Sequence, residues 1–232
     1  MTTGGNVKQA VDKSAIRDAA TIILTRGGPE GPEVLMGQRG AKAAFMPNKF
    51  VFPGGAVDAG DGAVPLAKTI NFDCGRRLAE GAGAARAHAL TVAAIRELWE
   101  ETGLPMAARL DWPGTPEPDW ESFAAAGMMP SAEGLTYVFR AITPSGRPRR
   151  FDARFFLAEV GAIATDPDDF SRASDELSHL QWIPLGKVRH FDLPFITEVV
   201  LAEIAHTLDH GPADSVPFFD NSGPESVFRR IA

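Results

Sequence analysis

The pattern of apolar and polar positions along the chain predicts several short strands and two long helices. Apolar runs of strand length occupy residues 19–25, 33–39, 135–143, 151–160 and 180–183, and a turn rich in Gly and Pro joins the first two as a hairpin. Apolar residues recur at helical spacing from about Ala85 to residue 102, and again over residues 194–208. Strands around one central helix, with another helix near the end, favour an α/β/α sandwich with a mixed β-sheet.

The central helix carries the first candidate chemistry. Gly103, followed by Pro105, ends this helix. Glu97, Glu100 and Glu101 share one helix face because they are three and four residues apart. Carboxylates this close repel one another unless a cation lies between them, and Mg²⁺ and Mn²⁺ prefer such oxygen ligands. A solvated acidic face is the alternative, because runs of charge usually face water.

A glycine-rich segment ahead of that helix is the second candidate. Pro53-Gly54-Gly55 follows a short apolar strand that ends at Phe52, and two aspartates, Asp58 and Asp61, come shortly after it. Paired glycines tolerate positive φ and let the backbone approach a ligand closely. Taken alone the segment is only a turn, so its function depends on whether it meets the glutamate helix.

Composition and charge narrow the function classes. The 232 residues, 44% of them hydrophobic, are enough for one large domain or two small ones. A net charge of −7 argues against nucleic-acid binding, but a small anionic substrate stays open because a metal can supply positive charge. A single cysteine, Cys74, which we interpret as structural, suits a reducing cytoplasm. No apolar run approaches the roughly 20 residues of a membrane span, so we expect no membrane partner.

The glutamate helix also resembles a family motif. Residues 96–104, Arg-Glu-Leu-Trp-Glu-Glu-Thr-Gly-Leu, resemble the core of the Nudix box, Gly-x5-Glu-x7-Arg-Glu-U-x-Glu-Glu-x-Gly-U, where U is aliphatic. Nudix enzymes hydrolyse a nucleoside diphosphate linked to another group and use Mg²⁺ or Mn²⁺. The first Gly of the box falls on Gly55, and Asp61 stands where the family has Glu. The resemblance implies the Nudix fold and chemistry, with the carbonyl of Gly54 as a metal ligand.

An insertion separates the two halves of the box. Residues 62–95 lie between Asp61 and Arg96, where the family has seven residues. The extra segment, about residues 62–90, predicts an added helix and a loop, which could form a lid or an oligomer contact such as that of a homodimer. A box split in this way resembles the mammalian peroxisomal coenzyme A diphosphatase subgroup, over about residues 19–205. The short segments that resemble this subgroup include Phe45-Met46-Pro47, Val57-Asp58-Ala59 and Arg149-Arg150-Phe151-Asp152.

The resemblance implies roles for the residues of the box. Glu97, Glu100 and Glu101 would hold the metal, with Asp61 as a further ligand, and Glu101 is our first choice for the essential one. Arg96 would brace the junction of loop and helix by pairing with a carboxylate of the box. Gly55 and Gly103 would give structural support to the site.

The general base is a separate question. Nudix relatives often place it in a late loop before a Trp-bearing strand, and Glu176 lies six residues before Trp182. Glu176 is therefore a candidate catalytic residue beside Glu97 and Glu101, although a plain surface acid remains the alternative. Asp175 is the second choice for the base.

Basic residues suggest where a substrate would be anchored. Arg39 stands 13 residues before Phe52, as in the upstream signature of coenzyme A hydrolases, but Gly40, Ala44 and Asn48 depart from that signature. A coenzyme A 3′-phosphate would need a basic anchor, and the candidates are Arg39, Lys42, Arg149 and Arg150. The last two lie with Arg147 at a hairpin tip, whose three arginines could hold phosphate, although simple solvation of the tip is an equal alternative.

The remaining segments are assigned to a single Nudix domain spanning residues 1–232. Residues 1–14 are interpreted as a loose leader, residues 105–134 as a loop-rich insert with one short helix, and residues 191–232 as a C-terminal helix and tail. Trp112 or Trp120 could stack on a base, but a capping hydrophobic contact is the favoured interpretation. No strand is predicted in the tail.

Three hypotheses for function follow from these observations. The first is a metal-dependent diphosphatase that cleaves coenzyme A or acyl-coenzyme A to 3′,5′-ADP and (acyl-)4′-phosphopantetheine. The second is the same chemistry on ADP-ribose, NADH or sugar nucleotides. The third is a nucleotide-binding module that keeps the fold without catalysis. Two departures from the motif favour it: Asp61 in place of Glu, and the insertion in the box.

Overall fold

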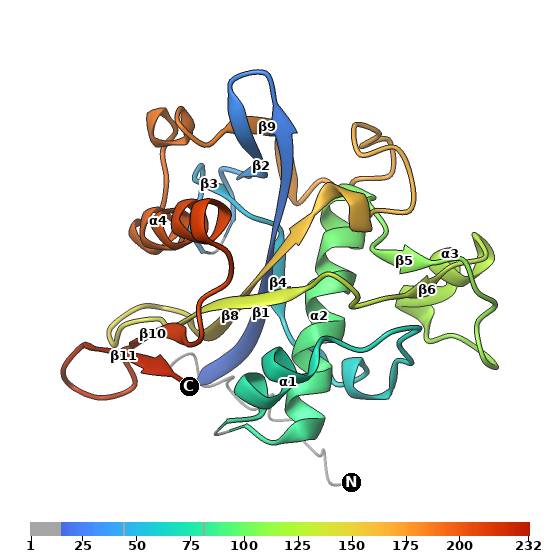
Figure 1. Ribbon diagram of the computed structural model, residues 1–232, viewed down its shortest axis with the longest axis horizontal. Helices are drawn as coiled ribbons and strands as arrows, with labels where there is room; N and C mark the ends of the chain where they lie inside the picture. The colour runs from blue at the N-terminus through green and yellow to red at the C-terminus, as the bar shows by residue number, and fades with distance from the viewer. Residues whose placement is uncertain (1–14, 44, 81) are drawn as a thin grey trace, which may run out of the picture.

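A mixed nine-stranded β-sheet forms the centre of the molecule, with helices on both faces (Figure 1). The computed structural model describes residues 15–43, 45–80 and 82–232, so the leader predicted at residues 1–14 lies outside them. The order along the sheet is β11-β10-β7-β8-β1-β2-β3, with β4 beside β1 and β9 beside β2. The strands are β1 (Ile16–Gly28), β2 (Gly31–Arg39), β3 (Phe50–Val51), β4 (Gly54–Ala56), β7 (Thr136–Ile142), β8 (Arg150–Glu159), β9 (Leu177–Pro184), β10 (Val216–Asp220) and β11 (Val227–Ile231).

The sheet is mixed because two of its pairings are parallel. β1 runs parallel to β8 and β7 runs parallel to β10, whereas β1 and β2 form the antiparallel hairpin predicted from their intervening turn. The other pairs are antiparallel. The predicted strand runs are confirmed, and each strand of the first hairpin extends beyond its apolar run.

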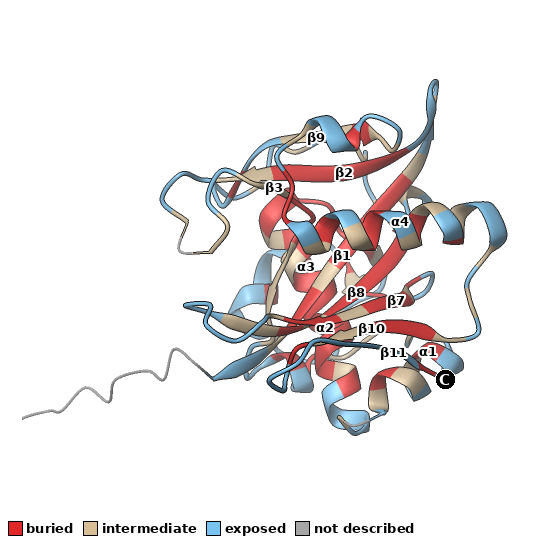
Figure 2. Ribbon diagram, turned by 90° about the vertical axis from the view of Figure 1, so that its left-hand side faces the viewer, coloured by how far each residue is buried: buried red, intermediate tan, exposed pale blue. Residues whose placement is uncertain are grey.

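Two long helices cover opposite faces of this sheet. α2 (Ala84–Thr102) packs on one face and α4 (Phe195–His210) on the other. Figure 2 shows the buried side of α4 turned towards the strands. α2 fits closely because much of its inner surface is alanine, and Gly103, at φ 74°, ends it with an N–H bond to the carbonyl of Trp99. The predicted α/β/α sandwich with a mixed sheet is confirmed.

The insertion in the box forms η1 (Asp61–Ala63) and α1 (Phe72–Ala79). α1 packs against α2 and β7 and reaches the C-terminal segment, where Arg76 binds the carbonyl of Ala232 and Arg77 that of Asp214. None of the described insert residues lines the main pocket. A lid over that pocket is therefore the wrong expectation for this insert, because its helix is packed beside the sheet instead.

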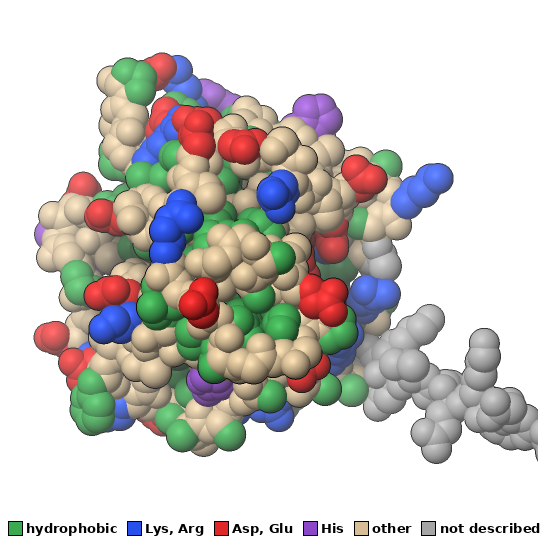
Figure 3. All heavy atoms as spheres, turned by 90° about the vertical axis from the view of Figure 1, so that its right-hand side faces the viewer, with side chains coloured by type: hydrophobic (Ala, Val, Ile, Leu, Met, Phe, Trp, Pro, Cys, Tyr) green, Lys and Arg blue, Asp and Glu red, His purple; other side chains and the backbone are tan. Residues whose placement is uncertain are grey.

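Residues 105–134 form a small separate layer beside α2. It contains β5 (Ala107–Ala108), η2 (Pro118–Trp120), α3 (Glu121–Ala125) and β6 (Met129–Pro130), and β5 pairs with β6. Trp120 is fully buried and packs against Trp112 and Phe123, as in a hydrophobic cap. On the face that includes this layer, acidic and basic side chains are interspersed (Figure 3).

The C-terminal strands β10 and β11 were not predicted. β10 joins the sheet through a parallel pairing with β7, and β11 extends it by an antiparallel hairpin. Two further 3₁₀ turns, η3 (Val160–Ala162) and η4 (Val188–His190), complete the described elements. Among the described residues, the structure has no helix with both the length and the apolar character needed to cross a membrane.

Candidate active site

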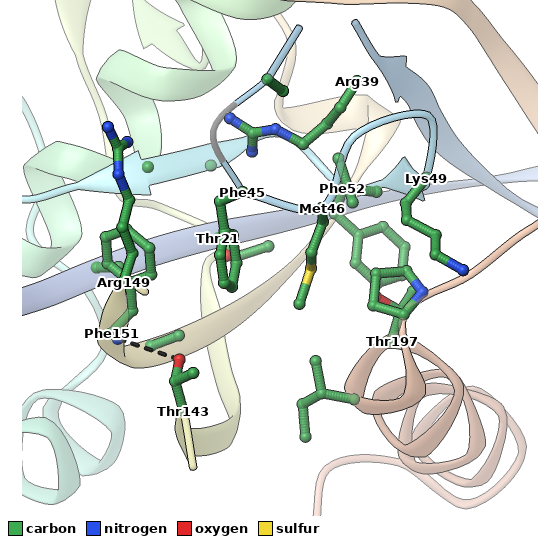
Figure 4. Close-up of a pocket in the computed structure, with 18 of the residues that line it drawn as sticks. Thr21, Arg39, Phe45, Met46, Lys49, Phe52, Thr143, Arg149, Phe151 and Thr197 are labelled. Atoms are coloured by element: carbon green, nitrogen blue, oxygen red, sulfur yellow. Dashed lines mark hydrogen bonds between the residues drawn. The ribbon is translucent and has the colours of Figure 1, made fainter. Parts of the chain in front are cut away.

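A pocket of about 1000 Å³ opens beside β4 and the middle of α2. One end is lined by Gly54, Gly55 and Glu97, together with Glu176. The other end is largely apolar, and its lining includes Phe45, Met46, Phe52, Phe155, Leu193, Phe195 and Ile196. In Figure 4, Arg149 and Phe151 lie on one side, Lys49 and Thr197 lie on the other, and Phe45 and Met46 lie between them. The acidic end therefore continues into an apolar chamber.

Arg96 holds the acidic residues of the box in place. Its side chain is only 4% exposed and binds Asp61 through Nε at 2.9 Å, and Glu97 and Glu100 through one terminal nitrogen at 3.0 Å each. The other terminal nitrogen binds the carbonyl of Ala56. Burial alone would lower the pKa of Arg96, but its bond with Asp61 and the charges around it raise the pKa above its usual value.

Glu101 is the most deeply buried carboxylate of the group. It is 1% exposed, and its Oε2 accepts a hydrogen bond from the backbone N–H of Gly54 at 2.7 Å. Its Oε1 has no hydrogen-bond partner among the described residues. Burial, reinforced by the charge of Glu97, raises the pKa of Glu101 well above its usual value, because the site lacks enough positive charge to favour the ionised form.

Glu97 lies against the glycine pair. A Cβ atom at Gly55 would stand 2.4 Å from Oε1 of Glu97, so a larger residue there would displace this carboxylate from its present position. Burial raises the pKa of Glu97 to about 7, although Arg96 acts in the opposite direction. The Phe-Pro-Gly-Gly segment thus meets the glutamate helix, as a site at this junction requires.

Asp61 and Glu100 were predicted to bind metal, and the structure turns both towards Arg96. Asp61 is 2% exposed, and its oxygens accept hydrogen bonds from Arg96 and from the N–H of Asp58. Glu100 pairs with Arg96 and does not line the pocket. Within the described part of the chain, no three His, Cys, Asp or Glu side chains gather as a ready-made metal site. In this structure both acids are partners of Arg96, and their role as metal ligands stays a prediction.

Glu176 enters the site from the loop before β9. Its carboxylate, 56% exposed, pairs with Arg39 at the end of β2 at 2.6 Å. Both residues line the pocket with Glu97, and so does Asp175. The sequence separated Arg39 and Glu176 into substrate anchor and candidate base, and the structure brings them into contact.

The other basic candidates separate into two groups. Lys42 and Arg149 line the pocket, whereas Arg150 binds the carbonyls of Thr143 and Asn221 and is absent from the lining. Arg150 therefore links the start of β8 to the C-terminal segment through these two hydrogen bonds to backbone carbonyls. Arg147, from the same hairpin tip, also lines the pocket. Sequence reasoning missed Arg17 and Lys49, which line the pocket as well and carry no motif that would single them out.

Comparison with known proteins bears on the family to which the chain belongs. The chain is 30% identical to a Caenorhabditis elegans protein assigned as nudix hydrolase 7, over 73% of this chain, and 26% identical to the acyl-coenzyme A diphosphatase NUDT19 of Gallus gallus, over 72% of it. It spans 52% and 60% of the length of those two relatives. No protein-family model matches the chain.

A solved structure is similar in fold as well. The Nudix hydrolase of Alicyclobacillus acidocaldarius aligns with a TM-score of 0.59 and 26% identity, over 83% of this chain and 92% of the other. The split box, the sandwich around α2 and these relatives agree with one another. The chain therefore belongs to the Nudix hydrolase superfamily.

Proposed function

We propose that this protein hydrolyses the pyrophosphate linkage of a nucleoside diphosphate derivative with the help of a divalent cation, Mg²⁺ or Mn²⁺. The observation that carries this proposal is the meeting of Glu97 and Glu176 with the Gly54–Gly55 backbone at one end of a large pocket, with Glu101 buried behind Gly54 and bonded to its N–H. A diphosphate in water resists attack because its own oxygens repel the nucleophile. A site for its hydrolysis therefore needs acids that can hold cations and a base that can activate water.

The residues present fit a divalent cation. Glu101 has a buried oxygen without a partner, and the oxygen donors of Glu97 and the carbonyl of Gly54 belong to the same junction. We propose these three as the ligands, with Asp61 and Glu100 as partners of Arg96. When bound, the cation would supply the positive charge that offsets the diphosphate oxygens and polarises phosphorus.

The remaining steps fall to the side chains of the chain. Glu176 would accept the proton of the attacking water, whose oxygen bonds to phosphorus as the anhydride bond breaks. Arg39, Lys42 and Arg149, which line the pocket, would bind phosphate oxygens through charge-assisted hydrogen bonds. Arg96, saturated by its own partners, would keep Glu97 in position.

Coenzyme A or an acyl-coenzyme A is the substrate that we propose. The apolar end of the pocket would accommodate an apolar extension beyond the diphosphate, and Lys42 and Arg149 would meet a further phosphate. A relative at 26% identity carries the name acyl-coenzyme A diphosphatase, which agrees with this choice.

A substrate panel tests the proposal. Purified protein is incubated with coenzyme A, acetyl-coenzyme A, ADP-ribose, NADH and a sugar nucleotide, each with Mg²⁺, with Mn²⁺ and with EDTA, and products are identified by mass. We expect 3′,5′-ADP and 4′-phosphopantetheine from coenzyme A, and none in EDTA. AMP from ADP-ribose or NADH alone would replace the substrate but keep the chemistry. Nucleotide binding without any product would instead favour a binding module.

A further inference from the structure

Two arginines serve the acidic end of the pocket, and they are held very differently. Arg96 is buried and bonded to Asp61, Glu97, Glu100 and a backbone carbonyl. Arg39 has one side-chain partner among the described residues, the carboxylate of Glu176 at 2.6 Å, and its Nε is buried without an acceptor. Guanidinium groups carry five N–H donors, so Arg39 is under-bonded where it lies.

The position of Arg39 lets it reach an incoming anion. It stands at the end of β2, its side chain is 20% exposed, and it lines the pocket together with Gly54, Glu97 and Glu176. Glu176 is more than half exposed, and an ion pair with such a carboxylate is weak because water screens it. A diphosphate offers several charged oxygens that match the guanidinium fork, so it is the better partner for Arg39.

While Arg39 is bound to Glu176, that carboxylate is engaged by a cation. Oε1 of Glu176 accepts a hydrogen bond from a terminal nitrogen of Arg39 at 2.6 Å, so the guanidinium occupies a position at this oxygen that a water would otherwise take. This oxygen of Glu176 is therefore occupied by Arg39 for as long as the pocket holds no anion. If the guanidinium of Arg39 moved to another partner, the carboxylate oxygen of Glu176 would become accessible to water.

We propose that Arg39 couples diphosphate binding to the availability of Glu176: the guanidinium leaves Glu176 for the diphosphate, and the freed carboxylate then faces the attacking water. This inference rests on the proposed function. Arg39 acts on the reaction through Glu176 and is in that sense a positioning residue. The exchange also gives a reason why an anchor and a base should lie in contact in the substrate-free pocket.

Binding of an analogue that cannot be hydrolysed tests the exchange. The probe is α,β-methylene-ADP, which carries the nucleoside diphosphate common to all candidate substrates, and its affinity is measured by calorimetry with Mg²⁺ present. If Glu176 competes for Arg39, Glu176→Gln should bind the probe about two- to fivefold more tightly than the wild type, the size of an exposed ion pair. Arg39→Gln should bind it more weakly, and Arg39→Lys should lie between, because Lys keeps the charge but lacks the fork.

The control separates the exchange from a general loss of negative charge. Asp175→Asn removes a charge from a neighbouring residue that lines the same pocket, and it should tighten binding less than Glu176→Gln. In the Arg39→Gln background, Glu176→Gln should no longer tighten binding beyond Asp175→Asn, since nothing is left to release. Thermal melting of each variant verifies that it is folded.

Two results would overturn the inference. One of them leaves the proposed hydrolase function intact, and the other contradicts it as well. Equal tightening by Glu176→Gln with and without Arg39 would show simple electrostatics, and the proposed hydrolase would stand. Failure of the wild type to bind the probe, together with no turnover of any panel member, would remove both the exchange and the proposed function.

Discussion

At the scale of single residues, the site depends on how few cations face its carboxylates. Glu101 has one backbone donor and one oxygen without a partner, and Glu97 shares Arg96 with Glu100. Burial raises the pKa of both Glu97 and Glu101 for this reason. A helix built from alanine and aliphatic residues thus carries acids that are costly to ionise in the absence of metal.

Glu101→Gln should reduce metal-dependent turnover by about 10²–10³-fold, the scale at which single preorganised groups act in catalysis. The protein should stay folded, because the amide keeps the size of the side chain and carries no charge. Initial rates at saturating substrate and circular dichroism measure both effects. The exposed Glu133→Gln is the matched control and should retain full activity. Near-normal turnover by Glu101→Gln would refute its assignment as a ligand.

Without metal, stability should depend on pH through Glu97. Burial raises its pKa from 4.5 to about 7, so between these values the folded protein holds a proton that the unfolded chain has released. The free energy of unfolding should therefore fall as pH rises through that window, by on the order of 3 kcal/mol. Urea unfolding in EDTA at about pH 5 and about pH 8 measures this, and Glu97→Gln should show a smaller difference. Identical pH dependence in the two proteins would contradict the assignment.

At the scale of elements, the insertion in the box is a structural addition. Asn71 caps α1 by accepting a hydrogen bond from the N–H of Cys74 at 2.9 Å, and the sulfur of Cys74 in turn accepts one from the N–H of Tyr137 in β7. α1 thereby joins α2, the sheet and the C-terminal segment. No residue of α1 lines the pocket, so a substitution in this helix should change stability without changing catalysis.

Asn71→Ala should lower the free energy of unfolding by about 1 kcal/mol, the usual value of an N-cap, and leave kcat/KM unchanged. Denaturant unfolding and steady-state kinetics measure the two quantities. Asn71→Asp keeps an acceptor at the cap and should restore most of the loss. A change in kcat/KM at wild-type stability would show instead that the insert takes part in the reaction.

At the scale of the whole molecule, a chain of charges crosses the sheet beneath the start of α2. Arg154 of β8 pairs with Asp18 of β1, and Asp152 of β8 binds Arg140 of β7 through two hydrogen bonds at 2.9 and 2.7 Å. Arg154 and Asp152 are both buried, with 3% and 9% of their surface exposed. The N-terminal strand β1 and the later hairpin of β7 and β8 are therefore joined by ion pairs as well as by backbone hydrogen bonds.

Asp152→Ala should destabilise the protein by about 3–5 kcal/mol, because it leaves the largely buried guanidinium of Arg140 without its carboxylate and takes one of two carboxylates from Arg154. Differential scanning calorimetry and denaturant unfolding measure the loss. Lys187→Ala, which breaks a fully surface-exposed pair with Glu30, is the control and should cost less than about 1 kcal/mol. If the two variants lowered the free energy of unfolding by similar amounts, the ion pairs across the sheet would contribute no more to stability than an exposed pair.

The sequence by itself determined the local features of this protein. Periodicity located the helix that carries Glu97 and Glu101, and the apolar runs located β1, β2, β3, β7, β8 and β9, because these patterns depend on neighbouring residues. Motif spacing also paired that helix with the Gly54–Gly55 turn despite the insertion, since a long loop adds little closure entropy.

Only the tertiary structure decided which residues meet. Arg39 and Glu176 are 137 positions apart, so no local pattern reveals their contact. The motif predicted a partner for Arg96 among the carboxylates of the box, and the structure identifies Asp61, 35 positions away, as one of its partners. The strand β10 forms because β7 offers it a parallel edge, whereas its short sequence with Pro217 gives no strand signal. The sequence named the acids of the site and Arg96 as a partner for one of them. Their burial and the pairing of Glu176 with Arg39 depend on distant segments, so only the tertiary structure decided these.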